Sequence, residues 1–288
     1  MKPLYKTPEA KKTILALYDQ KLQSLGIPYQ EMDVETTFGR TRVIRAGRAG
    51  GKAVVLFHGI NAGAPVTLEA VKALCDTYQF YAFDTPGQTT KSEEARLDTR
   101  GDAFALWADE VLDKLFLDTA DFIGISYGAF ILQKLMIYKP ERLKKCLLIV
   151  PAGPSNGPFW TSMTKLTVPL IRFMLTKKEK HLRAFTKAFV PEEDQHMHQL
   201  QRALLTGVHM DFRRPRLTLF KEVQHLQNPV YLMVAGEDVF FPGNLAAKRA
   251  RRIFPNLIEI YTLKDSKHIP SANLYNIMQQ KIKSWLED

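Results

Sequence analysis

Short apolar runs that alternate with helical patterns dominate this chain of 288 residues. Continuous apolar runs are typical of strands that are buried on both faces. When helices separate such strands, the strands form a mostly parallel sheet that helices cover on both faces, which is an α/β architecture. The predicted strands are residues 53–57, 80–83, 121–125, 143–150, 230–234 and 258–263, and the predicted helices are about 67–77, 100–117, 127–138, 244–254 and 271–286.

Two elements at the start of the chain stand outside this alternation. Apolar residues recur at helical spacing over residues 8–25, which predicts an amphipathic leader helix within residues 1–26. Residues 30–37 and 41–46 read as extended segments on either side of a turn at Phe38-Gly39-Arg40. We expect an antiparallel hairpin at one edge of the sheet, which brings the sheet to about eight strands.

One long segment interrupts the alternation after the sixth predicted strand. Nearly 80 residues separate the run that ends at Val150 from the run that opens at Val230, and their pattern is mostly helical. A structureless loop of that length is improbable in a compact domain. The sequence therefore predicts a helical cap at residues 154–228, inserted into a core that residues 1–153 and 229–288 form.

The most informative motif is Gly124-Ile125-Ser126-Tyr127-Gly128, which lies between a predicted strand and a predicted helix. A serine at such a strand-to-helix turn, with a glycine two residues away on each side, is typical of a nucleophile elbow. Glycine is required on both sides because a larger side chain would collide with the neighbouring backbone. Ser126 is therefore the candidate nucleophile.

Candidate partners for Ser126 follow later strands. A serine hydroxyl needs a base that is itself oriented by an acid. Asp238 comes shortly after the strand 230–234, and His268 follows the strand 258–263 across a short loop. The carboxyl ends of parallel strands share one edge of a sheet, where sites form. The chain order serine, aspartate, histidine supports a catalytic triad of Ser126, Asp238 and His268.

Other residues compete for two of these roles. Glu237 neighbours Asp238 and is the alternative acid. His58 directly follows the strand 53–57, too early in the chain for the base. The remaining histidines, all in the cap region, are interpreted as surface or packing residues: His181, His196, His198, His209 and His225. The loop after the strand 143–150 contains no carboxylate, which strengthens the assignment of Asp238.

With these motifs in place, the chain resembles the α/β-hydrolase family over essentially its whole length. His58-Gly59-Ile60 is similar to the family's His-Gly-x oxyanion loop. The resemblance implies that the backbone N–H groups of Ile60 and Tyr127 bind the developing oxyanion. The leader helix, the turn at residues 38–40 and the place of the cap look most like bacterial carboxylesterases of the Bacillus type.

The chain departs from the family pattern beside this loop. Asp84-Thr85-Pro86-Gly87 resembles the family's structural Asp-x-x-Gly turn. Family members usually continue Gly-x-Gly-x-Ser, whereas this chain reads Gly87-Gln88-Thr89-Thr90-Lys91-Ser92. The departure concerns the geometry of a loop near the site and leaves the triad intact.

The resemblance implies a serine hydrolase that acts on a small, largely apolar carboxylic ester, with no metal and no cofactor. Phe159, Trp160 and Phe173 in the cap, together with Phe240 near Asp238, are expected to line the substrate pocket, although core packing of the cap explains its aromatic residues equally well. Other acyl chemistry on the same triad stays open, including hydrolysis of thioesters, amides or C–C bonds and acyl transfer. A ligand-sensing receptor built on the same fold is the alternative from another class.

The formal charge of +10 raises the question of anionic partners. The cluster at residues 248–252 lies on an amphipathic helix and reads as a solvated face, so no nucleic acid is expected. Lys177-Lys178-Glu179-Lys180 is interpreted in the same way, in preference to a lid that seeks membranes. No apolar run approaches the ~20 residues that span a bilayer, so we expect no stable membrane insertion.

Cysteine usage and the first residues favour a reducing compartment. Cys75 and Cys146 are the only cysteines, and their apolar surroundings predict buried free thiols rather than a bridge. The first residues lack the charged and then apolar pattern of a signal peptide. We therefore expect a cytoplasmic protein, whose oligomeric state, a homodimer included, the sequence leaves open.

Overall fold

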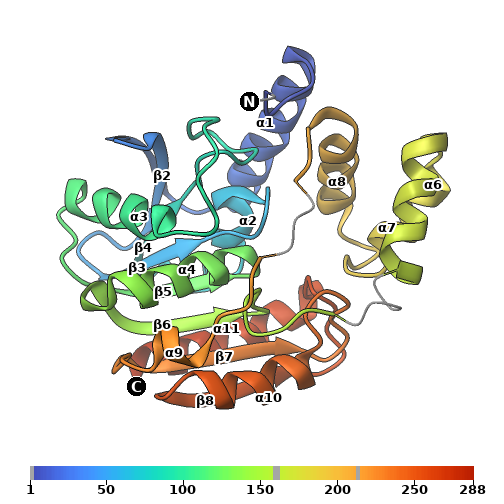
Figure 1. The fold of residues 1–288 in the computed structure, drawn as a ribbon. Coiled ribbons are helices and arrows are strands. Elements are labelled where there is room, and N and C mark those ends of the chain that lie inside the picture. Colours follow the sequence, from blue (N-terminus) through green and yellow to red (C-terminus); the bar gives the residue numbers. More distant parts are fainter. Residues whose placement is uncertain (1–2, 158–162, 212–214) are drawn as a thin grey trace.

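The computed structural model describes residues 3–157, 163–211 and 215–288. Its centre is an eight-stranded sheet in the order β1-β2-β4-β3-β5-β6-β7-β8. Figure 1 shows this sheet with helices packed around it. The strands β3 to β8 are parallel, whereas β2 joins β4 in the antiparallel sense. The strands are β1 (Tyr29–Thr36), β2 (Gly39–Gly47), β3 (Lys52–Phe57), β4 (Tyr78–Phe83), β5 (Ala120–Ile125), β6 (Leu143–Ile149), β7 (Val230–Ala235) and β8 (Leu257–Leu263). The predicted fold class is confirmed.

The expected hairpin lies at the edge of the sheet. β1 pairs with β2 in an antiparallel register that runs from Tyr29 opposite Ala46 to Thr36 opposite Gly39. β1 buries only Val34, whereas β2 buries four side chains. The outer strand therefore has the mixed, mostly exposed pattern of an edge and the inner strand the pattern of a half-covered one.

Helices cover both faces of the sheet, and each face has its own hydrophobic cluster. One cluster joins the strands to α3 (Ala103–Lys114), α4 (Tyr127–Tyr138) and α10 (Gly243–Ile253). The other joins them to α1 (Pro8–Ser24), α2 (Gly63–Glu69) and α11 (Ala272–Glu287). Strands that are buried on both sides need apolar residues at successive positions, which explains the continuous runs in the sequence.

The helix predicted at residues 67–77 differs in the structure. α2 begins earlier, at Gly63, and ends at Glu69, and the short 3₁₀ helix η1 (Lys72–Leu74) follows. The early start depends on a long-range contact, because the Ala64 N–H donates to Oδ1 of Asp84 at 2.9 Å. Val71, at φ −129°, interrupts the helical backbone between the two pieces. Cys75 therefore follows a 3₁₀ turn, and both it and Cys146 are buried and free, as predicted.

The segment between β6 and β7 contains η3 (Met163–Thr167, a π-helix), α6 (Val168–Thr176), α7 (Glu179–Thr186), α8 (Gln195–Gly207) and α9 (Phe220–Val223). α6, α7 and α8 lie beyond the carboxyl edge of the sheet in Figure 1. Their own cluster includes Phe173, Leu182 and Leu204, together with Ile14 of α1. A second 3₁₀ turn, η2 (Pro140–Arg142), connects α4 to β6.

Packing crosses the predicted limits of the cap. Val223 of α9 and Leu226 belong to the cluster of the sheet rather than to that of the cap helices. At the other end of the chain, α1 contributes Ile14 to the cap cluster and Leu22 to the cluster beneath the sheet. The domain boundaries at 153/154 and 228/229 therefore stay a prediction. Among the described residues, no helix is long and apolar enough to cross a membrane.

Candidate active site

Three polar side chains from different strand ends meet at the carboxyl edge of the sheet. Ser126 follows β5, Asp238 follows β7 and His268 follows β8. The Nε2 atom of His268 lies 2.9 Å from the Ser126 Oγ, and its Nδ1 atom lies 2.7 Å from the Asp238 Oδ2. The structure thus brings together the residues predicted from the strand ends, in one continuous hydrogen-bonded chain.

Backbone geometry holds the Ser126 hydroxyl at this edge. Ser126 has φ +54° and ψ −114°, a strained conformation for a residue with a side chain. Its N–H donates to the Ile149 carbonyl at 2.9 Å, which ties the turn to β6. A Cβ atom at Gly128 would lie 2.0 Å from the Phe57 carbonyl oxygen, and one at Gly124 would lie 2.6 Å from the Ala129 Cα. Only glycine fits at these two positions, as the motif predicts.

Asp238 is held so that one oxygen faces the histidine. Its Oδ1 atom accepts hydrogen bonds from the backbone N–H groups of Phe240 at 2.8 Å and Phe241 at 3.0 Å. The Oδ2 atom is then left for His268. Glu237, the alternative acid, is exposed, and its backbone N–H donates to the Ser266 carbonyl. Of the two neighbouring carboxylates, the structure places Asp238 in contact with the histidine.

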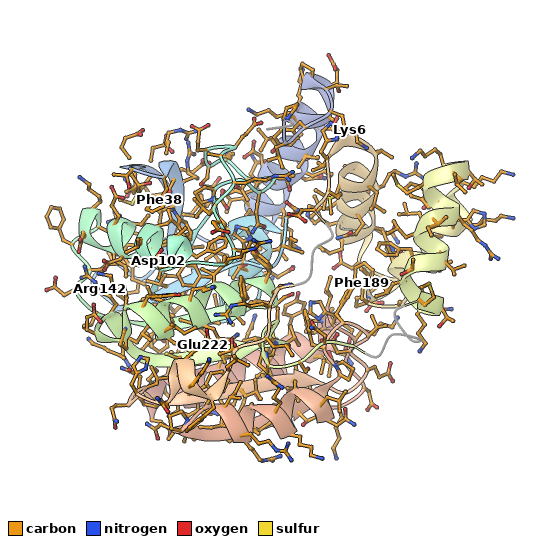
Figure 2. The ribbon with its side chains drawn as sticks, viewed as in Figure 1. Lys6, Phe38, Asp102, Arg142, Phe189 and Glu222 are labelled. Atoms are coloured by element: carbon orange, nitrogen blue, oxygen red, sulfur yellow. The ribbon has the colours of Figure 1, made fainter. Side chains whose placement is uncertain are left out.

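Aromatic rings enclose His268. The Phe240 ring packs edge-on against the imidazole at a centroid distance of 5.1 Å, and the Phe241 ring lies at 5.7 Å. Phe189, which follows α7, contacts Phe240 at 5.0 Å and accepts a backbone hydrogen bond from Ile269. Figure 2 shows Phe189 between the cap helices and the sheet. The cap thus supports the loop that carries His268.

The segment after β4 holds the loop of the predicted oxyanion donors. Asn61, next to Ile60, has φ +54°. Its N–H donates to the Gln88 Oε1 at 2.6 Å, and its side-chain oxygen accepts the Thr89 N–H at 3.1 Å. A Cβ atom added at Gly59 would lie 3.6 Å from the Ser126 Cβ, so the loop runs directly beside the serine. The backbone near Ile60 is thereby fixed against the elbow, close to Tyr127.

Two buried titratable groups, His58 and Asp84, hold the same loop. His58 is completely buried, its Nε2 atom accepts the Thr85 N–H at 2.9 Å, and its Nδ1 atom lies 2.7 Å from the Gly59 carbonyl. Burial lowers the pKa of His58 to about 4, which keeps the imidazole neutral. Burial raises the pKa of Asp84 to about 6, although N–H groups of Ala64 and Lys91 donate to its carboxylate. His58 is therefore structural, in agreement with its exclusion as the base.

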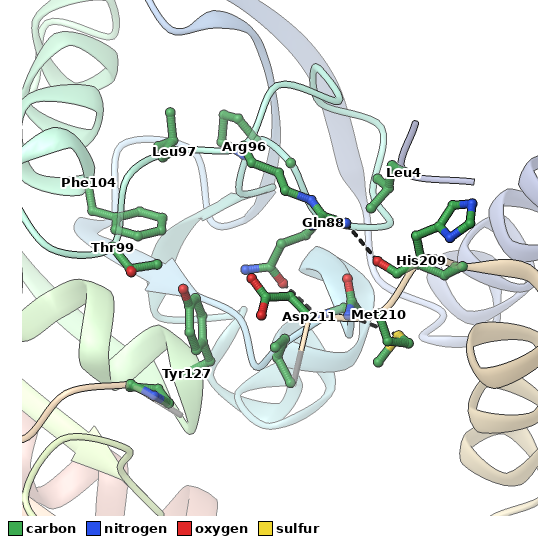
Figure 3. A pocket seen from close by; sticks show the side chains of 16 residues that line it. Leu4, Gln88, Arg96, Leu97, Thr99, Phe104, Tyr127, His209, Met210 and Asp211 are labelled. Carbon is green, nitrogen blue, oxygen red and sulfur yellow. Dashed lines mark hydrogen bonds between the residues drawn. The ribbon is translucent and has the colours of Figure 1, made fainter. Parts of the chain in front are cut away.

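A pocket of about 90 Å³ opens beside Ile60 and Tyr127 (Figure 3). Its wall is mixed, because Gln88, Arg96 and Asp211 lie alongside apolar residues. Arg96 donates to the His209 carbonyl at 2.7 Å, which connects the loop after β4 to the segment after α8. The other lining residues are Leu4, Asn61, Pro86, Gly87, Leu97, Thr99, Phe104, Val208, His209, Met210 and Pro215.

The four predicted substrate-binding residues have different outcomes. Phe240 is partly buried beside His268. Phe173 is fully buried within the cap cluster and is not among the residues that line the pocket. Phe159 and Trp160 lie outside the described residues. Substrate binding by these residues stays a prediction.

Sequence reasoning missed Gln88 and Asn61. The unusual sequence after Gly87 was the one signal that could have pointed to Gln88, but no local pattern shows that its partner is Asn61. Within the described part of the chain, no group of three or more His, Cys, Asp and Glu side chains is placed to hold a metal ion.

Comparisons with known proteins agree with this architecture. The family model described as alpha/beta hydrolase fold matches residues 52–176. Carboxylesterase YbfK of Bacillus subtilis is 26% identical over 281 residues, which cover 93% of this chain and 92% of that protein. The uncharacterized carboxylesterase nap of the same organism is 22% identical over 276 residues, 92% of this chain and 89% of that protein.

Solved structures show the same fold. The crystal structure of carboxylesterase CesB (YbfK) from B. subtilis matches with a TM-score of 0.80 at 22% identity, and the match covers 96% of this chain and 98% of that chain. Naproxen esterase (carboxylesterase NP) from B. subtilis matches with a TM-score of 0.82 at 19% identity, over 98% of this chain and 99% of that chain. The likeness therefore extends through the cap helices as well as the sheet.

Proposed function

Because the chain has the α/β-hydrolase fold and the model of that family matches residues 52–176, we propose that it is a serine carboxylesterase that hydrolyses small, largely apolar esters. One observation carries the proposal: His268 contacts Ser126 through Nε2, at 2.9 Å, and Asp238 through Nδ1, at 2.7 Å. A neutral imidazole in this arrangement carries its proton on Nδ1 and offers the Nε2 lone pair to the serine hydroxyl. The relatives named as carboxylesterases support ester bonds as the substrate class.

In the proposed first step, the Ser126 Oγ attacks the ester carbonyl carbon while His268 Nε2 takes the hydroxyl proton. The tetrahedral intermediate then collapses, the C–O bond to the alcohol breaks, and His268 returns the proton to the leaving alkoxide. Asp238 stabilises the imidazolium that exists between the two transfers. Water, activated in turn by His268, hydrolyses the acyl-enzyme, releases the carboxylic acid and regenerates Ser126.

In the tetrahedral intermediate, the negative charge lies on the former carbonyl oxygen, next to the turn that carries Ser126. We assign its stabilisation to the backbone N–H groups of Ile60 and Tyr127, which flank the serine from two strand ends. One such donor typically contributes about 3 kcal/mol to the stability of the transition state. The hydrogen bond of the Asn61 N–H fixes the planar peptide between Ile60 and Asn61, and with it one of the two peptides that flank Ile60, so it helps to hold the direction of the Ile60 N–H.

Labelling and turnover test the proposal together. A fluorophosphonate probe should add one label to the wild type and none to Ser126→Ala, and p-nitrophenyl esters of increasing chain length should show burst kinetics. A label at another serine would overturn the nucleophile. Slow turnover combined with a large increase in stability on ligand binding would favour the receptor, whereas turnover of thioesters or amides above that of esters would favour other acyl chemistry.

Four further expectations belong to this proposal. We place the enzyme in the cytoplasm because of its reduced cysteines, and we assign the cap to residues 154–228. Its partner is a small-molecule ester, and a homodimer remains to be tested by sedimentation.

A further inference from the structure

The outer face of α6 is apolar and uncovered. Val168, Ile171 and Leu175 are 37%, 51% and 80% exposed, respectively. Their spacing of three and four residues places them in one row along the helix. Phe173, on the opposite side, is completely buried in the cap cluster. The helix thus has two apolar sides, and only one of them packs against the protein.

The segment that carries this row is strongly positive. Residues 163–187 contain seven lysines and arginines but one acidic residue, a formal net charge of +6 out of +10 for the whole chain. Glu179, the acidic residue, is already engaged by Arg183 and Arg202. Five cations of the segment take part in none of the ion pairs between described residues: Lys165, Arg172, Lys177, Lys178 and Lys180.

One local feature supports a positive potential near this face. The pKa of His181 lies below its ordinary value, because of partial burial first and then because of Lys180, Arg172 and Lys178. The ammonium group of Lys177 lies 5.6 Å from the centre of the buried Phe173 ring, so this cation is drawn toward the packed side at the end of α6. In Figure 1, α6 forms the outer margin of the molecule, with its far side turned away from the sheet.

We infer that the apolar row of Val168, Ile171 and Leu175, with the cations around it, docks the protein on an anionic lipid surface. A helix that presents a short apolar stripe between unpaired lysines and arginines has the pattern of an interfacial segment, which enters the headgroup boundary and does not cross the bilayer. A protein partner would need a wider contact, since stable interfaces bury about 800 Å² on each side. A single convex helix offers much less.

The position of α6 places the proposed docking face close to the active site. α6 packs on α7, and Phe189 after α7 contacts Phe240, whose ring lies on His268. The docked face is therefore one helix away from the loop of the proposed base. The sequence interpretation of residues 177–180 as a solubilising cluster accounts for the charges but not for the exposed row.

Vesicle sedimentation tests this inference with the whole protein and without any ester substrate. The wild type should sediment with vesicles that contain phosphatidylglycerol and stay in solution with pure phosphatidylcholine. Each lysine or arginine near an anionic surface raises partitioning about fivefold. Salt should weaken the binding, because the Debye length falls from about 10 Å at 0.1 M to 3 Å at 1 M. No difference between the two vesicle types would overturn the inference.

Matched charge variants locate the surface. Arg172→Gln, Lys178→Gln and Lys180→Gln together should lower partitioning by about 100-fold, at the per-residue factor above. The control removes the same charge from α10, whose Lys248, Arg251 and Arg252 are exposed on a helix that buries Ala246, Ala250 and Ile253. The α10 triple should bind as the wild type does. If both triple variants lose partitioning equally, the effect depends on net charge alone, and the assignment of the docking surface to α6 is overturned.

A second variant tests the apolar row. Ile171→Ser with Leu175→Ser should fold normally, since both side chains are exposed, and should lose at least tenfold in partitioning. Unchanged binding would refute entry of this face into the interface. Sedimentation velocity without vesicles tests whether a second copy of the chain binds the row instead. If the wild type is a dimer and this double variant is a monomer, the row is a dimer interface and lipid docking is overturned. Because ester turnover is measured separately, failure here leaves the proposed esterase untouched.

Discussion

Asp238→Asn makes the clearest test of the triad, because the backbone around Asp238 fixes how an amide would sit. The N–H groups of Phe240 and Phe241 point at the Oδ1 position and can only donate. An asparagine must therefore place its oxygen there and its NH₂ group at the Oδ2 position, which faces the Nδ1 atom of His268. Facing a donor, Nδ1 has to accept, and the ring proton moves to Nε2.

The expected loss follows from this exchange of tautomers. With its proton on Nε2, His268 donates to the Ser126 hydroxyl and cannot take its proton. Loss of the correct tautomer lowers kcat by about 10⁴, which corresponds to about 5 kcal/mol. The fold should be unaffected, because both backbone N–H groups keep their acceptor. Asp238→Ala is a poorer test, since each buried N–H left without a partner costs about 1–3 kcal/mol.

The assay is turnover of p-nitrophenyl butyrate, with thermal unfolding followed in parallel. Glu237→Gln is the matched control: it removes the neighbouring carboxylate, which is exposed, whereas the Asp238 carboxylate is the one that contacts His268. It should stay near wild type. If Asp238→Asn retains activity within tenfold while its unfolding is normal, or if Glu237→Gln is the inactive variant, the assignment of the acid is wrong.

Three further predictions concern the elbow, the oxyanion loop and the buried charges. Gly128→Ala should lower the free energy of unfolding by about 1–3 kcal/mol in urea titration, because its Cβ would lie 2.0 Å from the Phe57 carbonyl oxygen; unchanged stability would contradict the tight turn. Gln88→Leu should lower kcat about tenfold or more with little change in KM, since a misdirected Ile60 N–H weakens a donor of the transition state; Thr99→Val, in the same pocket, is the control, and a change confined to KM would refute the positioning role. Between about pH 4 and 6, folded Asp84, with a pKa of about 6, holds a proton that the unfolded chain releases, so its contribution to the free energy of unfolding falls as the pH rises. Folded His58, with a pKa of about 4, lacks a proton that the unfolded chain binds, so its contribution rises with pH and opposes that of Asp84. Asp84→Asn should therefore make the free energy of unfolding rise more steeply with pH, by up to about 1.4 kcal/mol per pH unit, and an equal or smaller slope would count against this pair.

The sheet and the proposed triad could be predicted because both depend on patterns within short stretches of the sequence. Strands that are buried on two faces are apolar throughout, and Ser126 and Asp238 each follow such a strand closely, whereas His268 follows the half-exposed edge strand β8. Parallel topology then brings residues far apart in the chain to one edge. The start of α2 and the clamp on Asn61 could not be predicted, because each depends on a hydrogen bond to a residue 20 or 27 positions away.

Which apolar residues of the cap are buried could not be predicted from the sequence, for a different physical reason. Its apolar residues recur at helical spacing whether they face the protein or the solvent, so the sequence alone could not separate Phe173, which is fully buried, from Leu175, which is 80% exposed. Once the packed side of α6 is known, the remaining apolar row needs an explanation, because exposing large apolar side chains together opposes the hydrophobic effect. The cations near that row, which take part in no ion pair among the described residues, indicate that the surface covering it is anionic.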